Sequence, residues 1–462
     1  MRKKGKKIYT WARKSLIIAG FILVFFGSFQ PVFSFQEEIK TRSFSLDAAR
    51  EFAVKYNYDA IKSQLDLESA RKKLRETVAS GLPQLNTTLN YMNNLELTTV
   101  LIPNFFEGKF DEKIPVQFGT QHNATFTLQV NQLVFNGSYF VGLKTSSIYR
   151  RLADQGLERT KLDVQQNVTD TYHLVLVSEE SEKIMQASLN NLKKTHYEIK
   201  ELHKEGFVAE TDVDQLQVSV NSLENALQTL RRQIEVAYTL LKFQMGLELN
   251  EEIELTDSLD SFIRNLDPEK TLNAELDLEG NLDYQLLQTQ EKLADLALQN
   301  EKSKYLPTVS AFYTYQRNSY RDKFDFFSAD ARWFRAQILG INISLPLFKS
   351  GAQAARVKQA ALDLEKARNT RIQAGEGLRL QMERALSGLK SAYDNYVNMK
   401  ANMKLSKKIY SVTLTKYKEG ISSSMDLTQT HDKYLNSQSQ YIQSMSELLS
   451  AKNKLDRLTH NY

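Results

Sequence analysis

The distribution of proline limits the folds open to this chain more than any other feature. The seven prolines lie at positions 31, 83, 103, 115, 268, 307 and 346, so none lies between Pro115 and Pro268 and none after Pro346. A proline inside a helix costs about 3 kcal/mol, and both proline-free tracts are rich in residues that favour helices. The sequence therefore predicts long helices in these two tracts.

The chain also repeats itself. Asn57 and Asn281 begin stretches that match at a constant offset of 224 residues, and the offset falls to 214 further along. The first half is therefore longer than the second between those points. Matched positions include Leu82-Pro83 with Leu306-Pro307, Lys204-Glu205-Gly206 with Lys418-Glu419-Gly420, Asp212 with Asp426, and Gln215 with Gln429. Their order and spacing indicate a duplicated unit.

Each half has the pattern helix, strand, strand, long helix, tight turn and helix. Strands are predicted at 84–97, 123–135, 308–316 and 336–345, where apolar and polar side chains alternate as a sheet with unlike faces requires. At roughly ten residues each, these strands are long enough to cross an outer membrane when tilted.

The long helices are predicted at 141–205 and 352–418, and each would be about 100 Å long. After the turns, helices 211–246 and 424–459 carry core positions at alternating spacings of three and four, which indicates a coiled-coil seam. One shorter helix opens each half, at 44–79 and at 281–304. Stacked end to end, the two shorter helices of each half would cover the apolar stripe of the long helix.

The positive net charge of +5 comes from the N-terminus. Residues 1–34 hold seven basic side chains, no acidic one, and the apolar run Leu16–Phe26. This is the pattern of a secretory signal peptide, because a membrane anchor needs roughly 20 apolar residues. Cleavage after Ser34 would leave 53 basic and 55 acidic side chains. A nucleic-acid partner is therefore not expected.

The sequence carries no recognisable catalytic motif. It has no cysteine, which excludes disulfides, thiolate metal sites and a cysteine nucleophile. The six histidines show no metal-ligand spacing, and we find no zinc-protease motif, nucleophile elbow or phosphate loop. We therefore predict that the protein is not an enzyme and has no cofactor or metal.

Four segments are expected along the chain: a signal peptide (1–34), a first structural repeat (35–246), an acidic connecting segment (247–280) and a second structural repeat (281–462). The four strands cannot span a bilayer alone, since open edges would leave unpaired backbone groups in hydrocarbon at several kcal/mol each. Single-chain barrels start at eight strands. Strands must therefore be shared between chains, eight from two copies or twelve from three.

The duplicated motifs resemble those of the TolC-like outer-membrane efflux protein family. They are the strand starts Leu-Pro-x-Leu (82–85) and Leu-Pro-x-Val (306–309), the strand-to-helix exits at 133–137 and 345–351, and the turns at 206–213 and 420–427. The resemblance implies a mostly α fold with a small β part. Its long coiled-coil helices would form a periplasmic α-barrel, and four strands per chain would join a shared twelve-stranded, trimeric transmembrane β-barrel.

The resemblance implies a passive channel in the outer membrane, gated at its periplasmic coiled-coil tip. Its partners would be two further copies, outer-membrane lipid, a periplasmic adaptor (membrane fusion protein) and an inner-membrane pump of the RND, ABC or MFS type. Two alternatives are a secreted structural coiled-coil protein and a periplasmic adaptor subunit. The first does not explain four strands at duplicated positions, and the second would carry a compact Gly-rich β-domain that the sequence does not show.

The resemblance also assigns roles to residues of the turns. Asp426 matches an aspartate that forms a ring at the tip, and Gln429 replaces a second aspartate of that kind. Residues that hold the closed tip together are matched by Tyr417, Thr211 and Asp212, whereas the arginine of that latch falls at Ser422. From the residues alone, Asp212 and Asp426 are helix-capping residues.

The hairpin tips are also expected to contact the adaptor. The residues concerned are Lys204, Glu205 and Gly206 in the first half and Lys418, Glu419 and Gly420 in the second. Without the resemblance, both triplets are ordinary helix C-caps, in which a cation near the helix end is followed by glycine.

Overall fold

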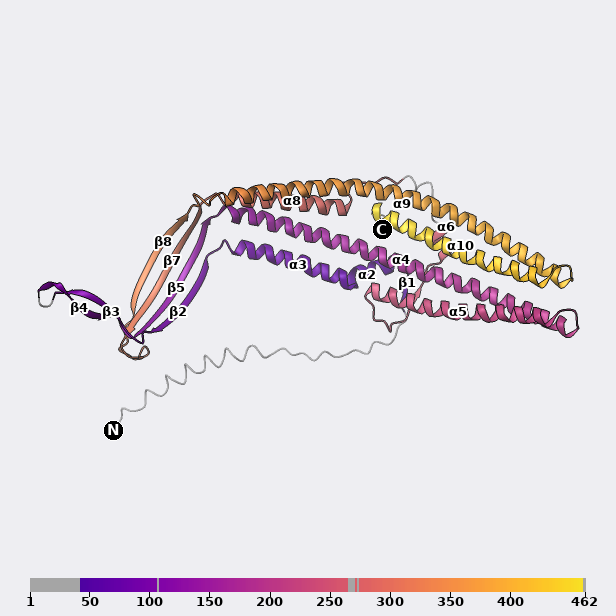
Figure 1. Cartoon of the computed structure of the whole chain (residues 1–462), viewed down its shortest axis with the longest axis horizontal. Helices are drawn as coiled ribbons and strands as arrows, with labels where there is room; N and C mark the ends of the chain where they lie inside the picture. The colour runs from indigo at the N-terminus through magenta and orange to yellow at the C-terminus, as the bar shows by residue number, and fades with distance from the viewer. Residues whose placement is uncertain (1–41, 106–107, 265–270, 272–273, 460–462) are drawn as a thin grey trace, which may run out of the picture. The chain divides into compact units, whose positions relative to one another are not determined.

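A computed structural model describes residues 42–105, 108–264, 271 and 274–459 (Figure 1). The expected signal peptide, Pro268 and His460 lie outside the described residues. Ser43–Tyr462 form one compact unit, which is mostly helical with a small part of β structure, as the sequence predicts.

The first half contains both predicted strands and the predicted long helix. Its elements are β1 (Arg42–Phe44), α2 (Leu46–Tyr56), α3 (Tyr58–Ala79), β2 (Gln84–Asn93), β3 (Thr98–Asn104), β4 (Lys109–Phe118), β5 (His122–Phe135), α4 (Gly137–Lys204) and α5 (Glu210–Met245). The connecting segment adds β6 (Ile253–Leu255) and α6 (Leu259–Arg264). The second half consists of α8 (Leu282–Ser303), β7 (Thr308–Arg321), β8 (Phe334–Ser344), α9 (Ala352–Lys418) and α10 (Ser424–Thr459).

The predicted single helix at 44–79 is wrong, because the chain breaks at Asn57 into α2 and α3. The Asn57 side chain accepts hydrogen bonds from the backbone N–H groups of Asp59 (2.8 Å) and Ala60 (3.2 Å), so it caps α3. Asn281 caps α8 in the same way. Asn57 and Asn281, which match at the offset of 224 residues, therefore have the same role as helix N-caps.

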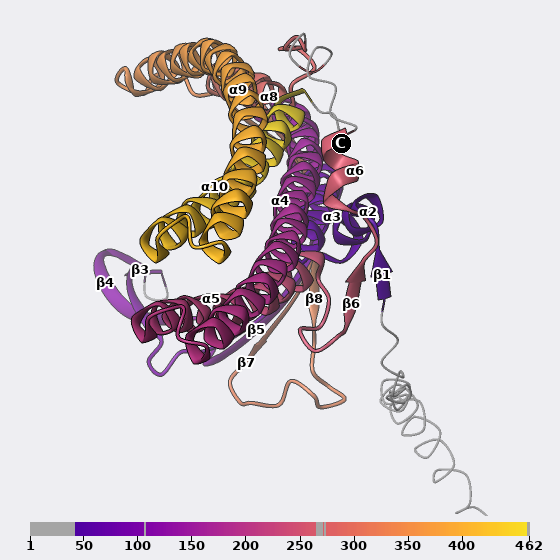
Figure 2. The ribbon, with the colours of Figure 1, turned by 90° about the vertical axis from the view of Figure 1, so that its right-hand side faces the viewer.

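The four long strands form one antiparallel sheet in the order β2-β5-β7-β8. The adjoining helices pack in the matching order α3-α4-α8-α9. Each strand continues into, or follows from, the helix at the same position in the row, so sheet and helices form one continuous layer that is curved where α4, α8 and α9 lie (Figure 2). Within the described chain, β2 and β8 are the free edges of the sheet.

Beyond the middle of the long helices, α5 pairs with α4 and α10 pairs with α9, and α4 contacts α10. The predicted seam of the first hairpin is confirmed, since it is buried along its length at Leu216, Val220, Leu223, Leu227, Ile234, Ala237 and Leu241. The second seam alternates large and small side chains, and its small members Ser437 and Ser444 are buried too.

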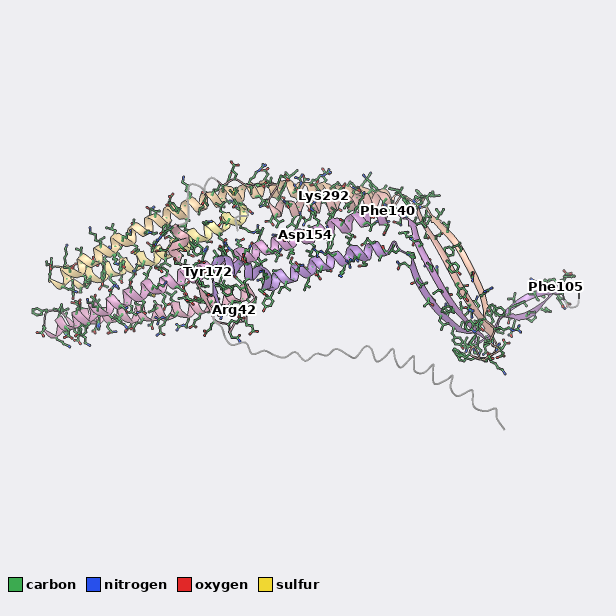
Figure 3. The ribbon with its side chains drawn as sticks, turned by 180° about the vertical axis from the view of Figure 1, so that it is seen from behind. Arg42, Phe105, Phe140, Asp154, Tyr172 and Lys292 are labelled. Atoms are coloured by element: carbon green, nitrogen blue, oxygen red, sulfur yellow. The ribbon has the colours of Figure 1, made fainter. Side chains whose placement is uncertain are left out.

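The β6 and α6 part of the connecting segment packs against the main core on the middle of α4, where Tyr172 lies (Figure 3). The buried Tyr172 hydroxyl lies 3.0 Å from the backbone oxygen of Phe44 and 3.0 Å from Asp257 Oδ2. Asp257 also accepts a hydrogen bond from the backbone N–H of Leu46. These bonds fix the start of α2 and the connecting segment to one side chain of α4.

The β3–β4 hairpin was not predicted. It lies in the connection between β2 and β5, a connection that is longer than the one between β7 and β8. This insertion accounts for the fall in the repeat offset. None of the helices in the described part of the chain is long and apolar enough to span a membrane.

Candidate functional site

The two faces of the sheet differ in chemistry, as the period-two alternation predicts. Directly paired residues share a face, so the strand registers assign every side chain to one side or the other. One face is predominantly apolar and includes Leu85, Leu89, Tyr91, Phe126, Leu128, Val130, Val309, Ala311, Tyr313, Leu339, Ile341 and Ile343. Leu339 is 81% exposed in the single chain, so this face has no cover of its own.

The opposite face is predominantly polar. Its members include Asn86, Thr88, Asn90, Thr125, Thr127, Gln129, Asn131, Ser310, Thr314, Gln316, Asn342 and Ser344. These side chains are uncharged and hydrogen-bonding, which suits contact with water. A sheet with an apolar side and an uncharged polar side is the pattern of a membrane barrel wall around a water-filled interior.

The two helical tips end in the same way. At the first tip, Gly206 has φ +79°, its N–H donates to the His203 carbonyl, and the N–H of Phe207 donates to the Leu202 carbonyl. At the second, Gly420 has φ +73° and makes the equivalent bond to Tyr417, while Ile421 bonds Lys416. Both are Schellman caps, in which the left-handed conformation favours glycine. Lys204, Glu205, Lys418 and Glu419 precede these glycines at the two tips.

The structure brings Tyr417 and Asp212 together across the two hairpins. The Tyr417 hydroxyl donates to Asp212 Oδ2 over 3.3 Å. Burial, reinforced by the neighbouring Asp212 carboxylate, raises the pKa of Tyr417 to about 12. The hydroxyl therefore stays protonated and remains a donor at neutral pH. Tyr417 also packs on the apolar seams of both hairpins, so it joins them by contact as well as by hydrogen bonding.

A second link between the hairpins was not anticipated. The Lys418 ammonium group forms an ion pair with Glu198 of α4. The sequence gives no sign of this pair, because Glu198 lies far from Lys418 along the chain and is one of many helical glutamates. Lys204 behaves differently, since its ion pair at 2.7 Å is with Glu201 of its own helix.

The matched aspartates Asp212 and Asp426 have different surroundings. Asp426 accepts bonds from the N–H (3.2 Å) and hydroxyl (2.8 Å) of Ser423, and its own N–H donates to Ser423 Oγ (3.1 Å). This is a capping box. The hydrogen bonds from Ser423, with a smaller contribution from Ser422, hold the pKa of Asp426 below its ordinary value. Asp212 instead bonds Tyr417, so only Asp426 caps its helix through its side chain.

Thr211 and Gln429, the remaining gate residues predicted at the tip, are exposed. Thr211 lies in the first turn of α5, and Gln429 lies one helical turn after Asp426 on α10. Ser422, at the position of the family's latch arginine, contacts Asp426 at 3.3 Å. His431 is 4% exposed, its ring lies 5.1 Å from the ring of Tyr410, and burial lowers its pKa. It is packed between helices.

No cluster of three or more metal-ligating side chains occurs among the residues that the structure describes. The sheet with unlike faces and the paired helical hairpins instead define the class as the subunits of outer-membrane channels. The sequence profile of the outer membrane efflux proteins matches residues 55–247 and 278–460. The chain belongs to that family, and the two matched regions agree with the internal duplication.

Solved structures show the same fold. The outer membrane protein VceC of Vibrio cholerae is 15% identical with a TM-score of 0.70, and the match covers 90% of this chain and 96% of VceC. The CmeC outer membrane channel of Campylobacter jejuni is 17% identical with a TM-score of 0.71, covering 90% of this chain and 85% of CmeC. The open state of the MtrE outer membrane channel of Neisseria gonorrhoeae is 14% identical with a TM-score of 0.69, covering 90% and 88%.

No curated protein sequence gives a significant match. The family nevertheless identifies the protein as an outer-membrane efflux channel. Members of this family are channels and not enzymes, which agrees with the lack of catalytic motifs in the sequence.

Proposed function

We propose that three copies of this chain close into one twelve-stranded barrel in the outer membrane, continued by a helical tunnel through the periplasm. The channel is passive and gated at its helical tips. A periplasmic adaptor docks on it, and an inner-membrane pump supplies the energy. The observation that carries this proposal is the shared order of strands and helices, which leaves both edges of one continuous layer open.

The open edges require closure by other copies. All ten residues of β2 are exposed in the single chain, and β8 is exposed along most of its length. Each unpaired backbone group in hydrocarbon costs several kcal/mol. Pairing β2 of one copy with β8 of the next removes both edges at once. The copy number of three comes from the family resemblance.

Crosslinking tests the closure and the copy number together. The chain has no cysteine, so thiol crosslinks within and between copies can form only at the introduced cysteines. We expect Leu89→Cys, combined in turn with Leu339→Cys, Ile341→Cys and Ile343→Cys, to give dimers and trimers with a short thiol crosslinker in outer membranes. The matched control combines Leu128→Cys, on the inner strand β5, with the same β8 positions and should stay monomeric. A product series that ends at the dimer, or no product from any pair, would contradict the trimeric barrel.

In this proposal, the contacts between the two helical tips belong to the closed state of the gate. The Tyr417–Asp212 bond and the Lys418–Glu198 ion pair hold the second hairpin against the first. Asp426 and Gln429 face the pore, where the aspartates of the three copies form its constriction, and Thr211 supports the latch beside Asp212. Opening requires the second hairpin to leave the first, which breaks both links.

Adaptor docking at the tips is best tested at Lys204. Its ion pair lies within its own helix, so Lys204→Glu changes the docking surface and leaves the link between the hairpins intact. We expect the yield of crosslinks between the channel and the adaptor to fall several-fold, because charges at the rim of an interface control the rate at which two proteins associate. Lys366→Glu, on the exposed surface of α9 away from the tips, is the matched control. Equal crosslinking of both variants and the unmodified chain would remove Lys204 from the adaptor interface.

A further inference from the structure

The β3–β4 hairpin is a separate two-stranded sheet that continues the β2–β5 strand pair beyond the end of the sheet opposite to the helices. The β2–β5 ladder continues past its last pair through a bond from the Asn94 N–H to the Gln121 carbonyl at 2.8 Å. After a break that contains Gly119, at φ +112°, pairing resumes at Thr98 and Phe118. Strands β3 and β4 pack on each other and make no extensive contact with any other described helix or strand. We call the segment Thr98–Phe118 the arm, with Phe105 at its free end (Figure 3).

One face of the arm is almost entirely apolar, whereas the other is mixed. Paired residues share a face, so Val100 with Val116 and Ile102 with Ile114 lie on the same side as Phe118. The other side carries Thr99, Leu101, Pro103, Lys113, Pro115 and Gln117. Phe118 is 55% exposed. A two-stranded hairpin is at best marginally stable alone in water, so this face needs a cover.

Proline restricts what that cover can be. Pro103 lies in β3 and Pro115 lies in β4. Because proline has no N–H to donate, it protects a strand edge against a further strand. One proline in each strand of the arm therefore disfavours cover by backbone pairing. The apolar face must instead be covered by side chains.

An uncovered aromatic pair lies on the otherwise polar face of the sheet, at the end where the neighbouring copy's arm would begin. Phe334, the first residue of β8, is 55% exposed, and Tyr320 of β7 is 53% exposed, with their rings 6.4 Å apart. The β7–β8 connection does not cover them, since its Phe324 and Phe326 pack on Tyr91 of the same chain's β2. In a closed barrel, the outer end of β8 lies beside the outer end of the next copy's β2, from which the arm begins.

We propose that the arm packs its apolar face on the Phe334–Tyr320 pair of a second copy of this chain. This inference rests on the barrel closure given under the proposed function and extends it. The arm continues the edge that the second copy must pair, and its uncovered apolar face meets an uncovered aromatic pair. It therefore fastens the closed assembly at the end of the sheet opposite to the helices.

Crosslinking of the full-length channel in outer membranes tests the arm. We expect Phe118→Cys combined with Phe334→Cys to form trimers with a short thiol crosslinker. Gln117→Cys combined with Phe334→Cys is the matched control, because Gln117 is the adjacent residue on the opposite face, and its yield should be at least several-fold lower. Val100→Cys combined with Phe334→Cys provides a second variant if Phe118→Cys reduces the amount of assembled channel.

The edge pairs of β2 and β8 separate the two possible failures. Crosslinks at the edges without crosslinks from either arm variant would overturn the arm contact and leave the barrel closure standing. Loss of both would contradict the closure itself. Equal yields from Phe118→Cys and Gln117→Cys would also overturn the proposal, because contact would then not depend on the face. Labelling of Phe118→Cys by a lipid-phase probe would assign the arm to the membrane surface instead.

Discussion

Replacing Gly246 with alanine is expected to destabilise the protein by about 3 kcal/mol or more. Gly246 ends α5 at φ +77°, a backbone conformation that residues other than glycine rarely adopt. A Cβ atom placed there would lie 2.1 Å from the backbone oxygen of Tyr56 and 2.6 Å from its carbonyl carbon. The backbone of Tyr56 cannot relieve this clash by rotating, as a flexible side chain could. The end of α5 must therefore move away from the joint between α2 and α3.

That joint makes the displacement costly. The Asn57 side chain caps α3 and also donates from Nδ2 to the Gln244 carbonyl at 2.7 Å, while its backbone N–H donates to the Ala53 carbonyl of α2, so one residue holds the ends of three helices. Moving α5 breaks this bond and opens the main core beside the buried Met245. The measured quantity is the free energy of unfolding in detergent. Unfolding by denaturant is monitored by the loss of the helical circular dichroism signal.

Gly156→Ala is the matched control for Gly246→Ala. Gly156 lies inside α4, and nothing is within 4 Å of a Cβ atom placed there. Alanine favours helices over glycine by about 1 kcal/mol, so this variant should be as stable as the original chain or slightly more stable. If Gly246→Ala lowers the free energy of unfolding by less than about 1 kcal/mol, the close approach of α5 to Tyr56 is not maintained in solution.

Long-range contacts explain where the sequence predictions of the fold stop. Proline-free tracts and apolar periodicity predict the helices and the four barrel strands to within a few residues, and α9 and α10 match their predicted bounds. The sequence prediction misses the break at Asn57 because no proline marks it. Asn57 caps α3 through local bonds, and its bond to the end of α5 is a long-range contact that local sequence does not encode.

The arm was missed for a different reason. The two prolines at 103 and 115 argue against a strand inside a sheet, so they do not predict this hairpin. Prolines are compatible with a ribbon whose edges stay unpaired. At the tips, the family resemblance matches Tyr417, Thr211 and Asp212 to residues that hold the closed tip together. The Lys418–Glu198 ion pair instead joins two helices that no short-range pattern relates.

Removing the charge of Asp426 is expected to weaken block of the channel by trivalent cations roughly tenfold or more. Three copies would bring three carboxylates to one narrow opening, and such a ring concentrates cations. The variant to use is Asp426→Asn, because an asparagine oxygen still accepts the hydrogen bonds from Ser423 and so keeps the capping box. Single-channel conductance in planar bilayers, with a trivalent cation added from the tip side, measures the block.

Two comparisons separate the pore role of Asp426 from its capping role. Gln429→Asp places a second carboxylate one helical turn further on, so it should strengthen block as Asp426→Asn weakens it. In the single chain, the hydrogen bonds from Ser423 lower the pKa of Asp426, whereas neighbouring carboxylates in a ring would raise it. Block is therefore expected at neutral pH, and the pH at which it is lost reports how strongly the three carboxylates interact. Unchanged block in Asp426→Asn would leave Asp426 as a helix cap alone and would move the constriction to another part of the tip.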